Sequence, residues 1–285
     1  MKAKKLLTLA LAAVMSVTAL AGCGKEENKS KKAKVIQIDL TSEEYAFGVD
    51  KDQKELLDDV NKFIEDIKAD GTFDEICNHY FGDGTPVAVK SAVLDESKDQ
   101  LVVATNAAFE PFEYMEGNKY LGIDMEIAAK LAESLGKELV IQNMDFDAVC
   151  LTVGQHKCDI AMAGLTIKPD REEYVTFSNP YYNASQRIVV MEDNTEFDNC
   201  ADGAAVEAIL KGKDASTKIG VQNGTTGQFY VAGDADWGFE GFKVQAVGYK
   251  NGSLAIQDMI NGNVNYVIID SAPAACITES INKMQ

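Results

Sequence analysis

LVVATNAAFEPFEYMEGNKYLGIDMEIAAKLAESLG, residues 101–136, decides the architecture of this chain. Its first five residues form a short apolar run of the kind that fills a buried β-strand. The apolar residues from Met125 to Leu135 follow helical spacing, Gly136 ends the helix, and Asp124 stands where an N-cap is expected. A strand followed by a helix is the unit of α/β proteins, so the stretch predicts that class if the unit recurs.

The same unit recurs along the rest of the chain. Short apolar runs predict further strands at 138–143, 159–163, 218–222, 243–247 and 265–270. Helical patterns lie between several of these runs, so the central sheets are expected to be mainly parallel. A chain of 285 residues is long enough for two such lobes. The predicted fold class is therefore α/β with two lobes.

The first 22 residues have the features of a bacterial secretory signal. MKAKK is basic, LLTLALAAVMSVTAL is apolar but short for a membrane span, and LAGC places Cys23 at a lipidation position. The alternative is an ordinary cleaved signal with an unrelated Cys23. We expect residues 1–22 to be a signal peptide, Cys23 to be lipidated and residues 23–34 to be a flexible tether.

The remainder of the chain is strongly acidic. Without Lys2, Lys4 and Lys5 it carries 24 basic and 45 acidic residues, a formal net charge of −21. Because such a protein repels nucleic-acid phosphates, we expect no nucleic-acid partner. Five further cysteines show neither zinc nor CxxC spacing: Cys77, Cys150, Cys158, Cys200 and Cys276. Two histidines also lack ligand-spaced companions, so no metal and no cofactor are expected.

Polar and aromatic residues follow the predicted strands at the ends where ligand sites of α/β sheets collect. These residues are Asn106, Phe109, Phe146, Gly164, Thr166, Arg171, Gln222, Thr226 and Asp270. Singly, Arg171 can be a surface ion-pairing arginine, Asp270 a helix N-cap, and the two phenylalanines core residues. Together they offer a guanidinium for a carboxylate, a carboxylate for an ammonium group, and aromatic faces for a side chain. A free zwitterionic amino acid requires this combination.

Nearly all of residues 35–285 resembles the amino-acid-binding receptors of ABC importers, solute-binding protein family 3. The resemblance is carried by VVATNAAFEPFEY, YLGIDMEIAAKLAESLG, MDFDAV, DIAMAGLTIKPDREEYVTFSNPYY, GVQNGTTG and YVIIDSAPA. It implies two α/β lobes that are joined by two hinge strands and close over one amino acid.

The resemblance also implies roles for single residues. Arg171 and Thr166 would hold the ligand carboxylate, assisted by the backbone at Thr226. Gly164 and Asp270 would bind the ammonium group. The aromatic sandwich and the contacts to the ligand side chain would come from Phe109, Phe146, Asn106 and Gln222.

The order of segments differs from that of the family. EEYAFGVDKD and the helix pair that follows, residues 43–82, resemble the end of the family chain but precede the strand at 101. This order predicts a circular permutation, with a gene-model artefact as the alternative. Lobe 1 would comprise 45–190, with 83–100 joining the old termini. Lobe 2 would comprise 35–44 and 191–285.

The expected function is capture of a free L-amino acid and its delivery to an ABC permease. The alternatives are an amino-acid-sensing lipoprotein and a dehydratase on the same fold, although Asn106 and Gln222 cannot ionise for acid–base work. We expect no catalytic residue, a monomer, and an extracytoplasmic position with a lipid anchor on Cys23. Many basic-ligand relatives carry aspartate at the position of Asn106, so a polar uncharged ligand such as glutamine is favoured.

Overall fold

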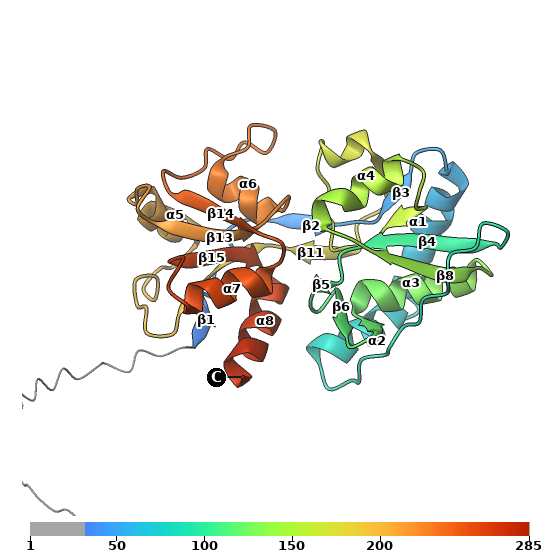
Figure 1. The fold of residues 1–285 in the computed structure, drawn as a ribbon, viewed down its shortest axis with the longest axis horizontal. Helices are drawn as coiled ribbons and strands as arrows, with labels where there is room; N and C mark the ends of the chain where they lie inside the picture. Colours follow the sequence, from blue (N-terminus) through green and yellow to red (C-terminus); the bar gives the residue numbers. More distant parts are fainter. Residues whose placement is uncertain (1–31, 285) are drawn as a thin grey trace, which may run out of the picture.

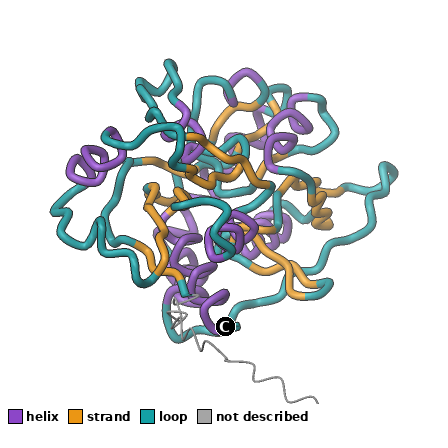
Figure 2. The backbone as a smooth tube through the Cα atoms, turned by 60° about the vertical axis from the view of Figure 1, so that its left-hand side comes forward, coloured by secondary structure: helices purple, strands orange, loops and turns teal. Residues whose placement is uncertain are grey.

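The computed structural model describes residues 32–284, which form two lobes around two five-stranded sheets (Figure 1). The predicted signal peptide, Cys23 and most of the predicted tether lie outside the described residues. Helices and loops surround the strands in both lobes (Figure 2). The two-lobed α/β architecture that the alternating pattern predicts is confirmed.

Lobe 1 is built on a sheet with the strand order β10-β3-β9-β4-β8. Its strands are β3 (Gly48–Asp50), β4 (Gln100–Thr105), β8 (Glu138–Asn143), β9 (Ile160–Ala161) and β10 (Val175–Phe177). Every residue of β4 is buried, as its apolar run predicts. A small antiparallel sheet follows β4 and consists of β5 (Ala108–Phe109), β6 (Glu113–Glu116) and β7 (Lys119–Leu121).

Lobe 2 is built on a sheet with the strand order β1-β12-β15-β13-β14. Its strands are β1 (Ala33–Val35), β12 (Gln186–Met191), β13 (Lys218–Gln222), β14 (Gln245–Tyr249) and β15 (Tyr266–Asp270). The Asn282 side chain hydrogen-bonds both the N–H and the C=O of Ala33. The first described strand is thereby fastened to the last helix.

Two short strands, β2 (Glu43–Tyr45) and β11 (Tyr182–Ala184), pair antiparallel between the lobes (Figure 1). β12 follows β11 almost directly and pairs with β1 and β15, so residues 186–190 belong to the lobe 2 sheet and not to lobe 1 as predicted. Ala33 and Lys34 are likewise part of β1 and not of the tether. β11 ends at Ala184 and β12 begins at Gln186, so a single residue separates the hinge strand from the lobe 2 strand, and the sequence pattern misplaces this boundary.

The sheets are mixed more than the strand–helix pattern suggests. Only β9-β4-β8 and β15-β13-β14 run parallel. β3, β10, β12 and β1 pair antiparallel with their neighbours. The chain crosses the hinge in both directions, so the strands that lead to and from it oppose each other.

Helices flank both sheets. In lobe 1 they are α1 (Lys54–Ala69), α2 (Thr72–Phe81), α3 (Ile123–Ser134) and α4 (Val149–Gly154), with 3-10 turns at Phe146–Ala148 and Arg171–Glu173. In lobe 2 they are α5 (Gly203–Lys211), α6 (Thr226–Ala232), α7 (Gly252–Ile260) and α8 (Ser271–Lys283).

The predicted cap of α3 is wrong. Gly122, at φ 123°, precedes the helix, and Asp124 lies inside it with its side chain fully buried. A Cβ atom at position 122 would lie 2.1 Å from the backbone oxygen of Phe112. The close approach of two backbones therefore sets the start of α3, and the Asp124 carboxylate is left for another contact.

Residues 83–99 link α2 to β4 and run along lobe 1. The Val89 N–H donates to Tyr120 O and the Ala92 N–H to Leu139 O, each at 2.8 Å. The Ser91 hydroxyl accepts from the Ile141 N–H at 2.8 Å. The segment predicted to join the old termini is thus attached to both β7 and β8.

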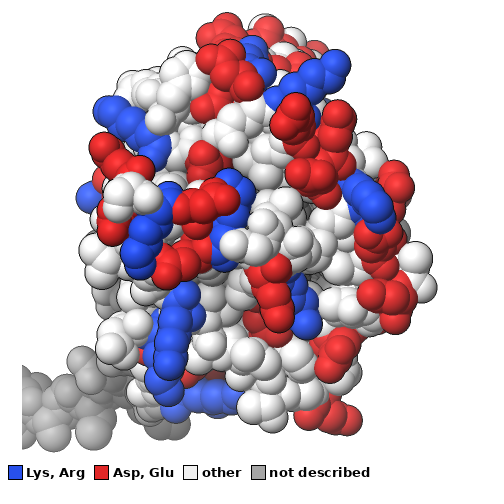
Figure 3. All heavy atoms as spheres, turned by 90° about the vertical axis from the view of Figure 1, so that its right-hand side faces the viewer, with Lys and Arg blue, Asp and Glu red and all other residues white. Residues whose placement is uncertain are grey.

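The surface follows the composition. Acidic side chains outnumber basic ones on the lobe 1 end of the molecule (Figure 3). Cys150 and Cys158 are buried and the other three described cysteines are partly buried, all as free thiols. Within residues 32–284, the structure contains no helix that combines the length and apolar character needed to span a bilayer.

Candidate functional site

Arg171 lies at the interface between the lobes. It is only 8% exposed. Its Nη1 donates to the Thr166 carbonyl at 2.7 Å within lobe 1, and its Nη2 donates to the Gly224 carbonyl of lobe 2 at 3.0 Å. These bonds use two of the five guanidinium N–H groups. Arg171 forms no salt bridge with any residue between 32 and 284. The alternative interpretation of Arg171, a surface arginine in an ion pair, is therefore wrong.

Asp270 ends β15 and occupies the N-cap position of α8, yet its side chain makes no capping bond. Its Oδ1 instead accepts from the Tyr45 hydroxyl of the hinge at 2.6 Å. Burial first, and the nearby Glu43 charge second, raise the pKa of Asp270 to about 7. The carboxyl group therefore faces the hinge and not the start of α8.

Hydroxyl groups from both lobes meet at a hinge carboxylate. The Thr166 hydroxyl donates to Glu43 Oε2 at 2.7 Å, and Thr226 Oγ1 lies 3.3 Å from Thr166 Oγ1. Glu43 Oε1 accepts from Gln186 Nε2 at 3.0 Å. Thr166 and Thr226, predicted from separate strand ends, are thus brought together, and Glu43 connects them to the region of Asp270.

Arg171 and Asp270, the two charged groups predicted to bind the head group of the ligand, lack ionic partners. Arg171 and Asp270 are both at least nine-tenths buried, and neither forms a salt bridge in the described part of the chain. Burying a charge without a counter-charge costs several kcal/mol. A zwitterionic ligand would supply a carboxylate to one group and an ammonium to the other.

Gly164 has a conformation and a neighbour that both require glycine. Its φ is 51°, and a Cβ atom there would lie 2.9 Å from Phe109 Cε1. Its N–H donates to Asp124 Oδ2 at 2.9 Å, while Asp124 Oδ1 accepts from the Tyr181 hydroxyl at 2.6 Å. Burial raises the pKa of Asp124 to about 7. Asp124 thus supports the backbone on which the Phe109 ring lies.

Phe146 takes a different place from Phe109. Its ring centroid lies 5.2 Å from Arg171 Cζ, and a Cβ atom at Gly224 would meet its Cδ1 at 3.6 Å. Phe109 is instead paired with Phe112 at 6.1 Å between centroids. No ring contact between Phe109 and Phe146 occurs within residues 32–284, so the predicted sandwich remains a prediction.

Asn106 and Gln222 meet across the interface. Gln222 Nε2 donates to Asn106 Oδ1 at 3.4 Å, and Asn106 Nδ2 donates to the Met144 carbonyl at 2.6 Å. Gln222 Oε1 is buried without a hydrogen-bond partner. An acceptor at the interface is therefore available to an N–H donor.

Glu113 of β6 is a further buried acceptor. Its side chain is fully buried and neither carboxylate oxygen has a hydrogen-bond partner. Burial first, and the charges of Asp124 and Asp270 second, raise the pKa of Glu113 far above its usual range. Glu113 pairs with Phe109 in the small sheet, so this carboxyl group lies beside the predicted aromatic wall.

Sequence reasoning missed Glu43, Tyr45, Glu113 and Lys168. Glu43 and Tyr45 are both buried and lie two residues apart in β2, as the alternation of a β-strand requires. A strand of three residues is too short for that alternation to be recognised in the sequence. Lys168 is 2% exposed although it lies in a polar loop. Phe229 and Asp234 of the other lobe contact its ammonium group, and the sequence pattern does not reveal these contacts.

His156 has companions that its spacing does not reveal. Its Nδ1 lies 2.8 Å from Asp50 Oδ2 and its Nε2 lies 3.6 Å from Asp52 Oδ2. The hydrogen bond to Asp50 raises the pKa of His156. His156 therefore forms a hydrogen-bonded ion pair with Asp50 and a longer ionic contact with Asp52.

Two α/β sheets, a two-stranded hinge and buried, opposite charges at the lobe interface define a two-lobed α/β protein with a candidate ligand site between its lobes. The model of the bacterial extracellular solute-binding proteins, family 3, matches residues 6–83 and 101–271. The chain belongs to this family, and it is accordingly an extracytoplasmic protein.

Curated relatives include proteins from several bacteria that are named arginine- or histidine-binding proteins. The arginine-binding extracellular protein of Bacillus subtilis is 33% identical over 44% of this chain and 46% of its own length. An ABC transporter arginine-binding protein of Escherichia coli is 29% identical over 61% of this chain and 64% of its own length. The chain thus spans about half to two thirds of the length of these relatives.

Solved structures show the same fold. An ancestral amino acid-binding protein, described as a precursor of cyclohexadienyl dehydratase, has 28% identity and a TM-score of 0.54 over 64% of this chain and 75% of its own. The arginine-bound, truncated arginine-binding protein of T. maritima has 30% identity and a TM-score of 0.51 over 64% and 78%.

Proposed function

We propose that this protein captures a free, polar L-amino acid outside the cytoplasm and hands it to an ABC permease. The observation that carries the proposal is the pair of buried, ionically unpartnered groups Arg171 and Asp270, which come from different lobes. Several relatives are named arginine- or histidine-binding proteins, and three of these names include an ABC transporter, which supports the same role.

The ligand head group would complete the contacts of the interface. Its carboxylate takes the free N–H groups of Arg171, and the hydroxyls of Thr166 and Thr226 join by exchanging their present acceptors, Glu43 Oε2 and Thr166 Oγ1, for the ligand. Its ammonium group takes Asp270, with Gly164 on the lobe 1 side. The carboxylate and the ammonium group of the ligand lose their water together when the lobes close. The free energy of binding the ligand therefore favours the closed arrangement of the lobes.

The ligand side chain is expected to carry N–H donors. Gln222 Oε1 is buried without a partner, and an unpaired buried acceptor costs about 1–3 kcal/mol. An amide, imidazole or guanidinium group relieves that cost, whereas an aliphatic side chain does not. Glutamine, histidine and arginine are therefore the first ligands to test.

A thermal-shift and calorimetry panel of the twenty amino acids tests the proposal. One or a few polar amino acids should stabilise the protein, with dissociation constants in the micromolar to nanomolar range, equivalent to about 8–12 kcal/mol. If no amino acid shifts the melting temperature, the proposed function is wrong.

The two arginines of the chain provide a matched pair of variants. Arg171→Ala should abolish binding, while Arg187→Ala, which loses a partly exposed ion pair with Asp39 and a hydrogen bond to Gln37, should bind normally. The unliganded Arg171→Ala protein should melt within a few degrees of the wild type, because the loss of an unpaired buried charge offsets two lost hydrogen bonds. A large fall in its melting temperature would make Arg171 a structural residue.

The chain order and the lipid anchor belong to the same proposal. The family match falls into two stretches that leave out residues 84–100, which supports a permuted order with a connector there. A rearranged gene that begins at residue 101 and places 32–82 after 284, so that β1 is kept whole, should yield a protein with the same ligand. Replacing Cys23 by Ser should release the protein from membranes, and retention would refute lipid anchoring there.

A further inference from the structure

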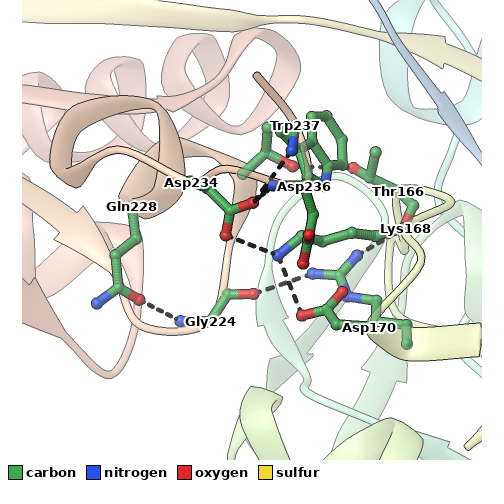
Figure 4. A network of polar contacts seen from close by, with 10 residues as sticks. Thr166, Lys168, Asp170, Gly224, Gln228, Asp234, Asp236 and Trp237 are labelled. Atoms are coloured by element: carbon green, nitrogen blue, oxygen red, sulfur yellow. Dashed lines mark hydrogen bonds and ion pairs between the residues drawn. The ribbon is translucent and has the colours of Figure 1, made fainter. Parts of the chain in front are cut away.

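Lys168 is buried between the lobes. It is 2% exposed and lies in the lobe 1 loop between Thr166 and Arg171. Its Nζ lies 3.4 Å from the centroid of the Phe229 ring, 3.0 Å from Asp170 Oδ2 and 3.4 Å from Asp234 Oδ2. Figure 4 shows the lysine between the two aspartates, with the Asp234 side chain arriving from the other lobe.

The partners of Lys168 divide by lobe. Asp170 belongs to the same loop and stays with the lysine whatever the lobes do. Phe229 belongs to α6 and Asp234 follows the same helix, so both move with lobe 2. If the lobes separate, Lys168 loses its contacts with the Phe229 ring and the Asp234 carboxylate and is hydrated instead. It keeps its ion pair with Asp170.

The lobe 2 side of this contact is oriented by hydrogen bonds within lobe 2. Asp234 Oδ1 accepts from the N–H groups of Asp236 and Trp237 at 3.1 and 3.2 Å, which leaves Oδ2 for Lys168 (Figure 4). The ammonium group thus meets an oriented carboxylate and a ring face within a desolvated space, where a cation–π contact is strongest.

We propose that Lys168 is an affinity-determining residue that acts through lobe closure: its contacts with Phe229 and Asp234 stabilise the closed arrangement for every ligand alike. This inference rests on the proposed function. Lys168 does not need to touch the ligand, because apparent affinity scales with the fraction of molecules that can close. The loop of Lys168 also carries Thr166 and Arg171. The contacts of Lys168 with lobe 2 therefore also hold these two predicted ligand-binding residues close to lobe 2.

Calorimetry on three variants of the purified protein tests the inference. Phe229→Leu removes the ring face but keeps an apolar side chain, and Asp234→Asn keeps an oxygen for the turn but loses the charge. Each should raise the dissociation constants of three different amino acids by one common factor of about tenfold. Asp170→Asn is the matched control within one lobe, and it should change them by less than about twofold.

Small-angle scattering of the unliganded proteins supplies a second readout. Asp234→Asn and Phe229→Leu should show a larger radius of gyration than the wild type, while Asp170→Asn should not. Unchanged dissociation constants in both cross-lobe variants, or loss factors that differ among ligands, would overturn the inference. If the wild type binds no amino acid, the proposed function fails, and equal scattering from all four proteins would then refute the closure role by itself.

Discussion

Binding should weaken as the pH falls, because the ligand ammonium group needs an ionised Asp270. Burial and the Glu43 charge raise the pKa of Asp270 to about 7 in the unliganded protein. A bound ammonium group favours the ionised carboxylate and lowers that pKa. The ligand must therefore expel a proton from Asp270 whenever the pH is below about 7.

The size of the effect follows from the pKa of Asp270. About 0.9 of the molecules carry the proton at pH 6 and about 0.1 at pH 8. The dissociation constant should thus rise about tenfold from pH 8 to pH 6 and about a hundredfold by pH 5. Each tenfold step corresponds to about 1.4 kcal/mol.

Calorimetry in two buffers of different ionisation enthalpy measures the proton count directly. Binding should release about 0.9 protons at pH 6 and about 0.1 at pH 8. Asp270→Asn should bind weakly, with no proton release and no pH dependence over this range. A constant wild-type affinity from pH 8 to pH 5 would show that Asp270 does not bind the ammonium group.

Three substitutions give further tests. Tyr45→Phe removes the hydroxyl that favours ionised Asp270, so the midpoint of the pH dependence should move above about 7 in the same calorimetric experiment. The raised pKa of Glu113 contributes stability that is present below about pH 4.5 and is lost as the pH rises through its folded value. In urea denaturation Glu113→Gln should therefore lose stability more slowly with rising pH, by up to about 1.4 kcal/mol per unit, and parallel curves would contradict this. Gly164→Ala should cost about 1–3 kcal/mol of unfolding free energy because of its positive φ and the Phe109 ring, and a neutral effect would mean that the loop relaxes freely.

Much of the fold could be predicted from local patterns. The strand β4 and the helix α3 form where the apolar residues of 101–136 predict them, because a run of apolar neighbours in the chain marks a segment that is buried. The predicted cap at Asp124 fails for the opposite reason. A positive-φ glycine starts the helix, and the buried carboxylate bonds Gly164, 40 residues away. Only the folded lobe reveals that contact.

The chain sequence by itself determined the alternating elements, the strand ends at which polar residues collect, and the candidates Arg171, Thr166 and Asp270. The tertiary structure alone decided which of these lose their access to water and which remain without a counter-charge. It also decided that Glu43 and Lys168, which lie in a hinge strand and a polar loop, are buried. Periodicity reports local burial, whereas the environment of a charge depends on groups that only the packing of two lobes brings within a few ångströms.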